Sequence, residues 1–405
     1  MTARPLRVLH VIPSVAARDG GPSQAIGPMC RSLIAAGVDV MLASTDADGP
    51  TRLDLTLGVP TTWNDVPAIF FHRNATESFK YSYGLSRWLR RHVCDYDVVH
   101  IHAVLSHASL AAAAACRADS VPYIVRPVGA ISKWSLSQKP WRKRLLLALA
   151  AKRMLTGAAA LHCTSEEERR GAAHSLGLTQ GVVIPHGVNA DAYTPQPAEM
   201  AMRDEHPYVL SLSRLHPVKN IEALIDAFAT ARAGLSTNWT LVIAGGGDEA
   251  YAKTLADRVQ ARGLAHAVTF TGWVDGTRKR DLLVQASLFA LPSSHENFGV
   301  AVIEAAAAHL PVLISSTVQL ADAVRAAHAG WIVPSETALA DVLREALVNL
   351  DERRARGHAA AAMAQQFSWS SVASQLQTLY RQVIANAART ESAPSALAAA
   401  EKLDR

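Results

Sequence analysis

Short apolar runs alternate with helix-period patterns along most of the chain. In the first half the runs are rich in Val and Ile, and polar or glycine-containing turns follow them. Continuous apolar runs of this kind predict strands buried on both faces, as in a parallel sheet covered by helices. Between the first two runs, apolar positions at helical spacing over 25–34 predict a helix that Gly37 ends. The strands predicted in this half are 8–12, 38–43, 69–72, 98–101, 123–125, 159–163 and 182–184.

The second half repeats the rhythm more regularly, which predicts a second doubly wound domain. Its predicted strands are 208–213, 240–244, 268–270, 288–291, 311–314 and 331–333. Its predicted helices are 220–232, 249–262, 277–285, 298–309, 318–328 and 337–350. The predicted fold class is therefore α/β, with two doubly wound, Rossmann-like parallel-sheet domains facing a cleft.

The segment 190–206 contains two prolines and no periodicity, which is typical of a linker. We therefore expect an N-terminal domain over 1–195 and a C-terminal domain over 205–368. An amphipathic pattern at 370–385 predicts one more helix, and the Ala-rich, charged residues 386–405 are expected to be mobile. Ligands of open α/β sheets bind at the carboxyl ends of the strands, so the expected site lies in the cleft between the domains.

The most specific motif runs from Ser293 to Ala305, after the predicted strand 288–291. Glu296 lies just before a predicted helix. Glu304 lies eight residues after Glu296 and within that helix, roughly 12 Å further along the chain. Between them, the backbone N–H groups of Asn297, Phe298 and Gly299 would make a helix N-terminus that binds anions. Two carboxylates that flank a phosphate site match the sugar, diphosphate and ribose of a nucleotide sugar.

The alternative for this motif is a helix-start charge at Glu296 and a solvated helix residue at Glu304. The neighbours of Glu304 argue against it, because the residues at 302, 303, 305 and 306 are Val, Ile, Ala and Ala. A carboxylate on a helix that is apolar nearly all round is buried and needs a partner.

Arg214 and Lys219 lie in the loop that follows the predicted strand 208–213. Two cations there could neutralise a diphosphate and stabilise the charge that grows on it as the glycosidic bond breaks. Taken alone, this loop is equally typical of a solvated basic turn.

Two glycine motifs also follow predicted strands in this half. Gly245 and Gly246 begin a run of three glycines that predicts close approach of the backbone to a ligand. The spacing does not match a dinucleotide fingerprint. The segment from Gly272 to Val274 could frame a base through backbone contacts, whereas a packing role is the simpler interpretation of Trp273.

The first half offers two looser candidates. Gly20 and Gly21 form a glycine-rich turn before the helix at 25–34 and could contact phosphate or acceptor through the backbone. His102 ends the predicted strand 98–101 and could contact the transferred sugar, although a lone histidine is more often structural.

Taken together, these residues resemble the group-1 (family 4) retaining glycosyltransferases of GT-B fold, over the whole chain and in order. The resemblance implies that Arg214 and Lys219 hold the donor diphosphate, with Gly20 and Gly21 close to it. It also implies contacts of the donor with the glycines at 245 and 246 and the backbone at Val274. Glu296 and the backbone of 297–299 would hold the donor sugar, Glu304 the ribose, and His102 would touch the sugar near the reacting carbon.

The resemblance further implies front-face substitution with retention of configuration, and a C-terminal helix that crosses back to the first domain. It implies no catalytic metal and no cofactor besides the donor substrate. Neither the donor base and sugar nor the acceptor follows from the sequence, so GDP-mannose-like and UDP-hexose donors both stay open.

Composition adds little to this picture. The 405 residues are 49% hydrophobic, enough for two cores, and the net charge of +5 suits an anionic small molecule or surface. Four cysteines without a CxxC pair indicate a reduced, cytoplasmic chain with buried thiols. The sequence contains no stretch of 18 uncharged apolar residues, so no membrane-spanning helix is predicted.

Residues 129–153 carry seven basic side chains and no acid, with Trp and Leu interleaved. Such a stretch is typical of a segment that binds peripherally to an anionic membrane, so we expect contact with the inner leaflet. The expected acceptor is a lipid-linked glycan, for example one linked to polyprenyl diphosphate, as in bacterial surface-polysaccharide assembly. An ordinary helix with a solvated basic face, or a site for a soluble phosphorylated acceptor, is the alternative.

Three rival functions stay open at this stage. A nucleotide-sugar epimerase of the same shape would need no acceptor. A nicotinamide-dependent oxidoreductase would use Asp46 after the second strand but lacks the glycine spacing. A non-catalytic binder of nucleic acid would use the basic stretch, although the sequence holds no recognisable nucleic-acid-binding motif.

Overall fold

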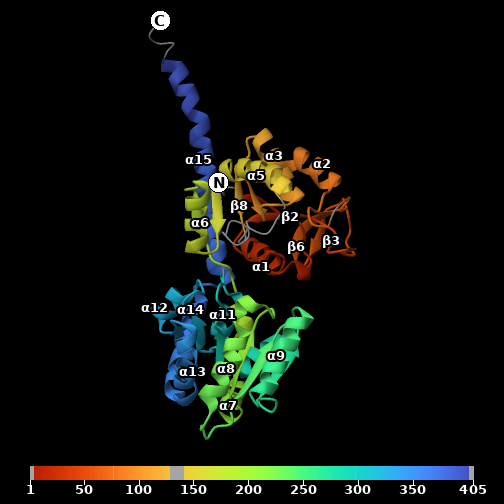
Figure 1. Cartoon of the computed structure of the whole chain (residues 1–405). Coiled ribbons are helices and arrows are strands. Elements are labelled where there is room, and N and C mark those ends of the chain that lie inside the picture. The colour runs from red at the N-terminus through yellow and green to blue at the C-terminus, as the bar shows by residue number, and fades with distance from the viewer. Residues whose placement is uncertain (1–3, 76, 128–140, 297, 401–405) are drawn as a thin grey trace. The chain divides into compact units, whose positions relative to one another are not determined.

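The computed structural model describes residues 4–75, 77–127, 141–296 and 298–400, with the backbone alone for 141–148, 202, 204 and 390–400. The chain divides into two compact units (Figure 1). Unit 1 comprises Met1–Gly187 and Trp369–Arg405, and unit 2 comprises Val188–Ser368. Each is built on a parallel sheet with helices, so the predicted α/β class is confirmed.

Unit 1 holds an eight-stranded sheet of order β10-β9-β8-β7-β1-β2-β6-β5, in which only the pairing of β5 with β6 is antiparallel among the described residues. Seven of these strands were predicted, with small shifts at their ends. The strands are β1 (Arg7–Val11), β2 (Asp39–Thr45), β5 (Thr61–Trp63), β6 (Val66–Phe71), β7 (Val98–His102), β8 (Tyr123–Arg126), β9 (Ala160–Cys163) and β10 (Gly181–Val183). The edge strand β5 and the ribbon of β3 (Ala47–Asp48) with β4 (Thr51–Arg52) were not predicted, because they are too short to show a period.

Helices cover this sheet, and serine side chains cap several of them. Ser82, Ser106 and Ser165 each accept a hydrogen bond from the amide three residues on, which satisfies a donor that the first turn leaves unpaired. The helices are α1 (Gly21–Ala35), α2 (Tyr83–His92), α3 (His107–Ala118), α5 (Trp141–Thr156), α6 (Glu166–Leu176) and α15 (Trp369–Ala400), with 3-10 turns η1 (Ala17–Asp19) and η2 (Val93–Asp95).

Helix α15 contains the predicted helix 370–385 and continues to Ala400. It packs along α1 within unit 1, and Tyr380 is fully buried against the sheet (Figure 1). Three cysteines are buried as expected, whereas Cys94 is exposed.

Unit 2 holds a six-stranded parallel sheet of order β13-β12-β11-β14-β15-β16. Its strands are β11 (Tyr208–Leu212), β12 (Thr240–Ala244), β13 (Val268–Gly272), β14 (Leu288–Leu291), β15 (Val312–Ser315) and β16 (Gly330–Val333). Its helices are α7 (Pro197–Glu205), α8 (Ile221–Arg232), α9 (Glu249–Ala261), α10 (Gly276–Gln285), α11 (Val300–Ala307), α12 (Ala321–Ala327), α13 (Leu339–Val348) and α14 (Leu350–Gln365), with 3-10 turns η3 (Ala190–Tyr193), η4 (Pro217–Lys219) and η5 (Glu336–Ala338).

The break between the units differs from the predicted one. The segment 190–206 is not a linker, because η3 and α7 fold onto α11 and α10 of unit 2. The guanidinium of Arg203 donates to the carbonyls of Val284 and Ala308, and Arg280 pairs with Glu199 at 2.7 Å. Because polar contacts hold this segment, its sequence shows no apolar periodicity. The predicted end of the N-terminal domain, at 195, is therefore later than the observed one at Gly187.

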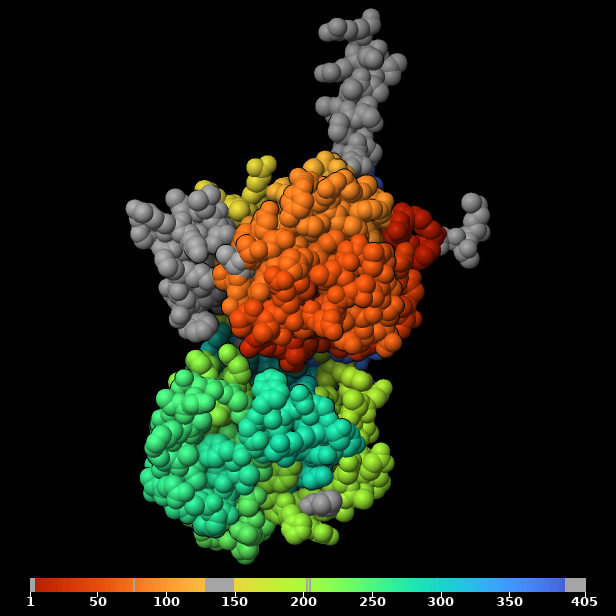
Figure 2. All heavy atoms as spheres, turned by 90° about the vertical axis from the view of Figure 1, so that its right-hand side faces the viewer, coloured from red at the N-terminus to blue at the C-terminus, as the bar shows by residue number. Residues whose placement is uncertain are grey.

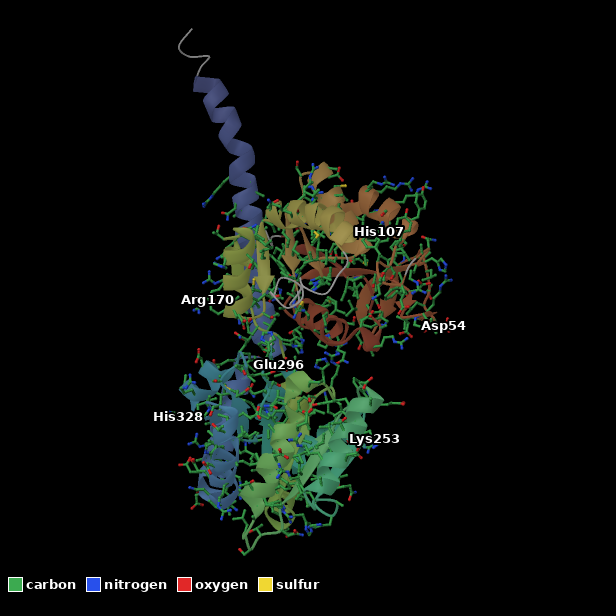
Figure 3. All side chains as sticks on the ribbon, viewed as in Figure 1. Asp54, His107, Arg170, Lys253, Glu296 and His328 are labelled. Carbon is green, nitrogen blue, oxygen red and sulfur yellow. The ribbon has the colours of Figure 1, made fainter. Side chains whose placement is uncertain are left out.

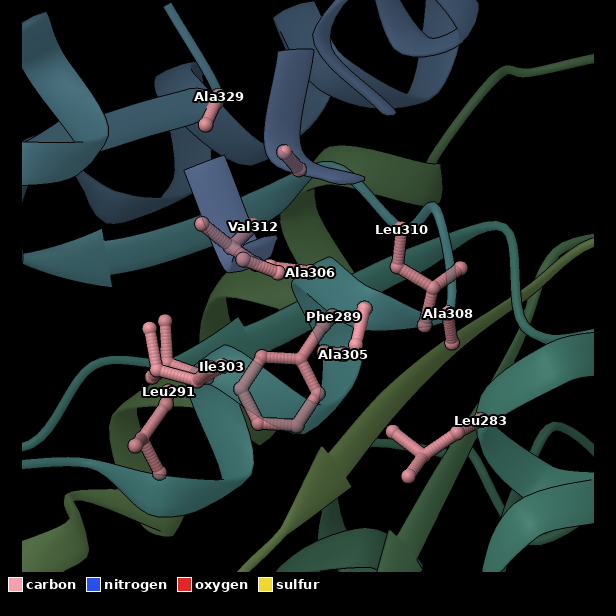
Figure 4. Close-up of a cluster of buried hydrophobic side chains, with 14 of the residues drawn as sticks. Leu283, Phe289, Leu291, Ile303, Ala305, Ala306, Ala308, Leu310, Val312 and Ala329 are labelled. Carbon is pink, nitrogen blue, oxygen red and sulfur yellow. The ribbon is translucent and has the colours of Figure 1, made fainter. Parts of the chain in front are cut away.

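Helix α11 is anchored by an apolar core on the sheet of unit 2. Its residues Ile303, Ala305 and Ala306 lie with Phe289 and Leu291 of β14 in one buried cluster (Figure 4). Burial of this kind stabilises by about 25 cal/mol per Å² of apolar surface. The core therefore holds fixed the helix that begins with the most specific sequence motif.

Candidate active site

The strand order of unit 2 brings two of the candidate loops together. Strand β11 pairs with β14, although β12 and β13 lie between them in the sequence, so the topology reverses at this pair. Such switch points are where open α/β sheets bind ligands. The loops that follow β11 and β14 meet there, and the amide of Ser294 donates to the carbonyl oxygen of Val218 at 2.9 Å.

Lys219 and Glu296 form an ion pair between these two loops. The Nζ of Lys219 donates to Oε2 of Glu296, and their side chains are only 13% and 19% exposed. Lys219 ends the turn η4, while Glu296 lies just before α11 (Figure 3). The sequence assigned these two side chains to different parts of a donor, and the structure places them in direct contact.

Arg214 lies in the same loop as Lys219 but is exposed. Its guanidinium makes no hydrogen bond or ion pair with any part of the chain that the structure describes. A cation beside the switch point is therefore open to an anionic ligand.

The start of α11 has the backbone of an anion site. Gly299 caps it with φ of +85°, a conformation that favours glycine, and a glycine has no side chain to accept a hydrogen bond from the first turn. Phe298 is buried and packs edge-on against Phe367, with ring centroids 6.0 Å apart. Asn297, the third residue predicted here, lies outside the described residues.

Glu304 has two partners that the sequence did not reveal. The Nζ of Lys279 lies 2.6 Å from its Oε1, and the hydroxyl of Tyr193 donates to the same oxygen at 2.9 Å. The carboxylate is thus partly buried and paired, as its apolar helix required. Burial and the nearby carboxylate raise the pKa of Tyr193, so its hydroxyl stays protonated as the donor. Lys279 and Tyr193 carry no motif, and only folding brings them to Glu304.

Gly245 and Gly246, which follow β12, differ in how much space surrounds them. A Cβ on Gly245, whose φ is +140°, would lie 1.8 Å from the carbonyl oxygen of Ser213. The close approach predicted for Gly245 is therefore to the backbone of the neighbouring loop. Gly246 is different, because a Cβ there would meet only the Cβ of Trp273 at 3.9 Å.

We expect Gly245→Ala to lower the free energy of unfolding of unit 2 by about 3 kcal/mol or more, because the backbone at Ser213 has to move. Gly246→Ala is the matched control and should change it by less than about 0.5 kcal/mol. Urea denaturation of the two variants, followed by circular dichroism, checks this. Equal stabilities would contradict the packing role of Gly245.

Beyond β13, Trp273 and Val274 differ in burial. Trp273 is 59% exposed, so the packing role that the sequence favoured is wrong, while Val274 is buried in the core. Gly272 adopts φ of +69°, which turns the chain at this point.

In unit 1, Gly20 and Gly21 start α1 at the carboxyl end of β1. Gly20 has φ of +83°, and among the described residues beyond the adjoining chain nothing lies within 4 Å of a Cβ built on either glycine. Space on the Cβ side of both glycines is therefore open.

His102 does not lie at the surface. It is fully buried, and its Nε2 lies 3.0 Å from Nδ1 of His10. Its Nδ1 has no hydrogen-bond partner among the described residues. The predicted sugar contact thus meets a side chain that water does not reach here, within a layer of buried histidines that the sequence did not reveal.

That layer spans neighbouring strands on one face of the sheet. His162 donates from Nε2 to the carbonyl oxygen of Ile184, so its Nδ1 accepts from Nε2 of His100, whose Nδ1 in turn accepts from the hydroxyl of Tyr380. This direction requires neutral rings. Burial lowers the pKa of His10 to about 3 and that of His100, His102 and His162 well below the usual range.

Two family models match most of the chain. Residues 20–187 match the glycosyl transferase 4-like domain, and residues 194–363 match glycosyl transferases group 1. The chain belongs to the group-1 (family 4) glycosyltransferases of GT-B fold. The matched segments also contain the Gly20 turn in unit 1 and the loops after β11 and β14 in unit 2.

Several curated relatives of this glycosyltransferase are named as mannosyltransferases, and others as D-inositol 3-phosphate glycosyltransferases. Phosphatidyl-myo-inositol mannosyltransferase of Mycobacterium leprae is 29% identical over 310 residues, which cover 74% of this chain and 77% of the relative. GDP-mannose:cellobiosyl-diphosphopolyprenol alpha-mannosyltransferase of Komagataeibacter xylinus is 24% identical over 398 residues, 94% of each chain.

Solved structures agree on the fold. Anabaena HepE in complex with UDP and glucose superposes with a TM-score of 0.72 at 18% identity, over 93% of this chain and 100% of that one. Sucrose-phosphate synthase from Thermosynechococcus elongatus reaches 0.73 at 22% identity, over 95% and 100%. At these identities the likeness establishes the GT-B fold.

The rival functions are not favoured. Asp46, on which the oxidoreductase hypothesis depended, is buried and bonded to His72 and to the amide of Arg73. Of the basic stretch 129–153, residues 129–140 lie outside the described residues, and 141–148 appear only as backbone of α5. Among the described residues, no helix combines the length and apolar character that a membrane crossing needs.

Proposed function

We propose that this glycosyltransferase moves a hexose from a nucleoside-diphosphate sugar onto a lipid-linked glycan, with retention of configuration and without a metal ion. The observation that carries the proposal is the Lys219–Glu296 pair at the switch point of unit 2, directly before the open N-terminus of α11. The cation and the helix amides would bind the diphosphate of a nucleotide sugar, and the carboxylate beside them would bind the sugar.

Within this site, Arg214, Lys219 and the α11 N-terminus would neutralise the diphosphate, which is the task a metal ion performs elsewhere. The acceptor oxygen attacks the anomeric carbon from the face that the diphosphate leaves. The bond from that carbon to the phosphate oxygen breaks, and the departing oxygen takes the proton of the acceptor hydroxyl. Glu296 would hold sugar hydroxyls, and the second oxygen of Glu304 would accept from the ribose.

Names of the relatives guide the choice of substrates. Those of M. leprae and K. xylinus name a phosphatidylinositol and a polyprenol-diphosphate acceptor, and the latter names GDP-mannose. GDP-mannose is therefore the first donor to test, with UDP-glucose second because HepE binds UDP and glucose. We propose a role in glycolipid or surface-polysaccharide synthesis, in the cytoplasm at the inner leaflet, with no nucleic-acid partner.

The proposal is tested by incubating the full chain with each donor and a polyprenyl-diphosphate-linked disaccharide, with and without EDTA. We expect a trisaccharide lipid whose new anomeric carbon has the configuration of the donor by proton NMR, and no loss of rate in EDTA. An inverted product, or an isomerised nucleotide sugar formed without acceptor, would refute it.

Membrane attachment has its own test. The exposed Lys152 and Arg153 near the end of α5 continue the basic stretch 129–153, and we expect the chain to co-sediment with anionic vesicles at low salt. Binding should weaken as salt rises, because Coulomb attraction to the surface is screened. Equal binding to neutral phosphatidylcholine vesicles would contradict an electrostatic attachment.

A further inference from the structure

Unit 1 contains an imidazole held by a buried carboxylate, outside every motif discussed so far. The Nδ1 of His72 lies 2.9 Å from Oδ2 of Asp46. The Asp46 side chain is 3% exposed, whereas that of His72 is 43% exposed. The second oxygen of Asp46 accepts the amide of Arg73 at 2.7 Å, so the carboxylate is fixed from both sides.

The fold places this pair at the ligand-binding edge of the sheet. Strands β2 and β6 are parallel neighbours, with Thr45 opposite Phe71, and Asp46 and His72 are the next residues of the two strands. Both therefore lie at the carboxyl ends, where doubly wound sheets bind their ligands. The segment that includes β6 and α2 forms the orange surface of this unit in Figure 2.

Charged contacts connect the same edge to the glycine turn before α1. Lys80, beyond β6, binds Asp19 at 2.9 Å, next to Gly20. Arg18, in the same turn, donates to the carbonyl oxygen of Asp48 at 3.3 Å. The loops after β1, β2 and β6 are thus held as one platform.

The orientation of the His72 ring follows from its partner. A carboxylate only accepts hydrogen bonds, so Nδ1 is the donor to Asp46, and Nε2 is the nitrogen that carries the lone pair whenever the ring is neutral. A turn that needed only a donor for Asp46 would be satisfied by many side chains. An imidazole on a buried carboxylate adds a fixed acceptor on its far side.

We propose that His72 binds the acceptor substrate, with Nε2 accepting a hydrogen bond from a sugar hydroxyl, and that Asp46 is its positioning residue. The inference rests on the proposed function and adds the residue by which unit 1 recognises a polyol acceptor. The reacting proton still passes to the departing diphosphate.

The test compares His72→Asn with His72→Gln, using octyl glucoside and octyl mannoside as acceptor probes. The amide of Asn can keep the contact to Asp46 but offers no acceptor at the Nε2 position, whereas Gln places its carbonyl oxygen there. We expect the KM of His72→Asn for the acceptor to rise about tenfold, which is the loss of about one hydrogen bond. The dissociation constant of the donor and the slow hydrolysis of donor by water should stay unchanged, and His72→Gln should recover part of the loss.

His92→Asn is the matched control. The Nδ1 of His92 lies 3.0 Å from Asp95, and its side chain is 42% exposed, but this pair precedes β7 at the amino ends of the strands. It should leave the acceptor KM unchanged. An unchanged KM in His72→Asn, or a parallel fall in transfer, hydrolysis and donor binding, would overturn the inference. A wild type inactive with every donor would instead refute the proposed function together with it.

Discussion

Lys219→Ala is expected to lower kcat about 100-fold, the order of losing one charge-assisted contact to the transition state. Lys219 is largely removed from water and bonded to Glu296, so its charge is already oriented before the substrate binds. Negative charge grows on the diphosphate as the bond to the sugar breaks, and the ammonium group is most useful at that moment. The KM for the donor should rise less than kcat falls.

Steady-state kinetics measure this effect, with whichever of GDP-mannose and UDP-glucose supports transfer in the assay proposed above. Lys253→Ala is the control, because Lys253 forms an exposed ion pair with Asp257 on α9, apart from Glu296 (Figure 3). It should keep the kcat of the wild type. A Lys219→Ala variant with near-wild-type kcat would remove Lys219 from the reaction.

Acid is expected to unfold unit 1 through its buried histidines. In the unfolded chain each imidazole titrates near the ordinary value of 6.5, whereas the folded pKa of His10 is about 3 and those of His100, His102 and His162 are well lowered by burial. Below pH 6.5 the unfolded state therefore binds more protons than the folded one. The stability is fully present above that pH and falls by about 1.4 kcal/mol per pH unit for each such group, or about 2 kcal/mol each by pH 5.

Urea denaturation at a series of pH values from 7.5 to 5 tests this expectation. The free energy of unfolding should decrease steeply below pH 6.5, and His162→Gln should reduce the slope by about one proton. His174→Gln, at an exposed position of α6, serves as the control and should leave the slope unchanged. A stability that stays flat down to pH 5 would show that these rings are not held neutral.

Sequence patterns located the sheets well, for a physical reason. Strands of a parallel sheet are buried on both faces, so β12 and β14 appear as uninterrupted apolar runs with the predicted bounds. Helix α14 was not predicted because its buried residues are mostly small, Gly357 and Ala360 among them, and give little periodic contrast. The turn η3 and helix α7 were not predicted because polar contacts of Arg203 and Arg280 hold them.

The part of the site that depends on the order of the strands was predictable from the sequence. Lys219 and Glu296 each follow a strand of unit 2, and adjacent parallel strands bring such residues together. The partners of Glu304 were not predictable, since Lys279 and Tyr193 reach it from separate elements without a shared motif. A structural role for His102 was the commoner expectation for a lone histidine, but its partner was not predictable, because the contact with His10 joins strands far apart in the sequence.

A crystal structure of the full chain with GDP or UDP bound tests the central assignment most directly. We predict the diphosphate within hydrogen-bond distance of Arg214, Lys219 and the first amides of α11, with the ribose next to Glu304. A nucleotide bound elsewhere, with these groups still pairing only among themselves, would contradict it.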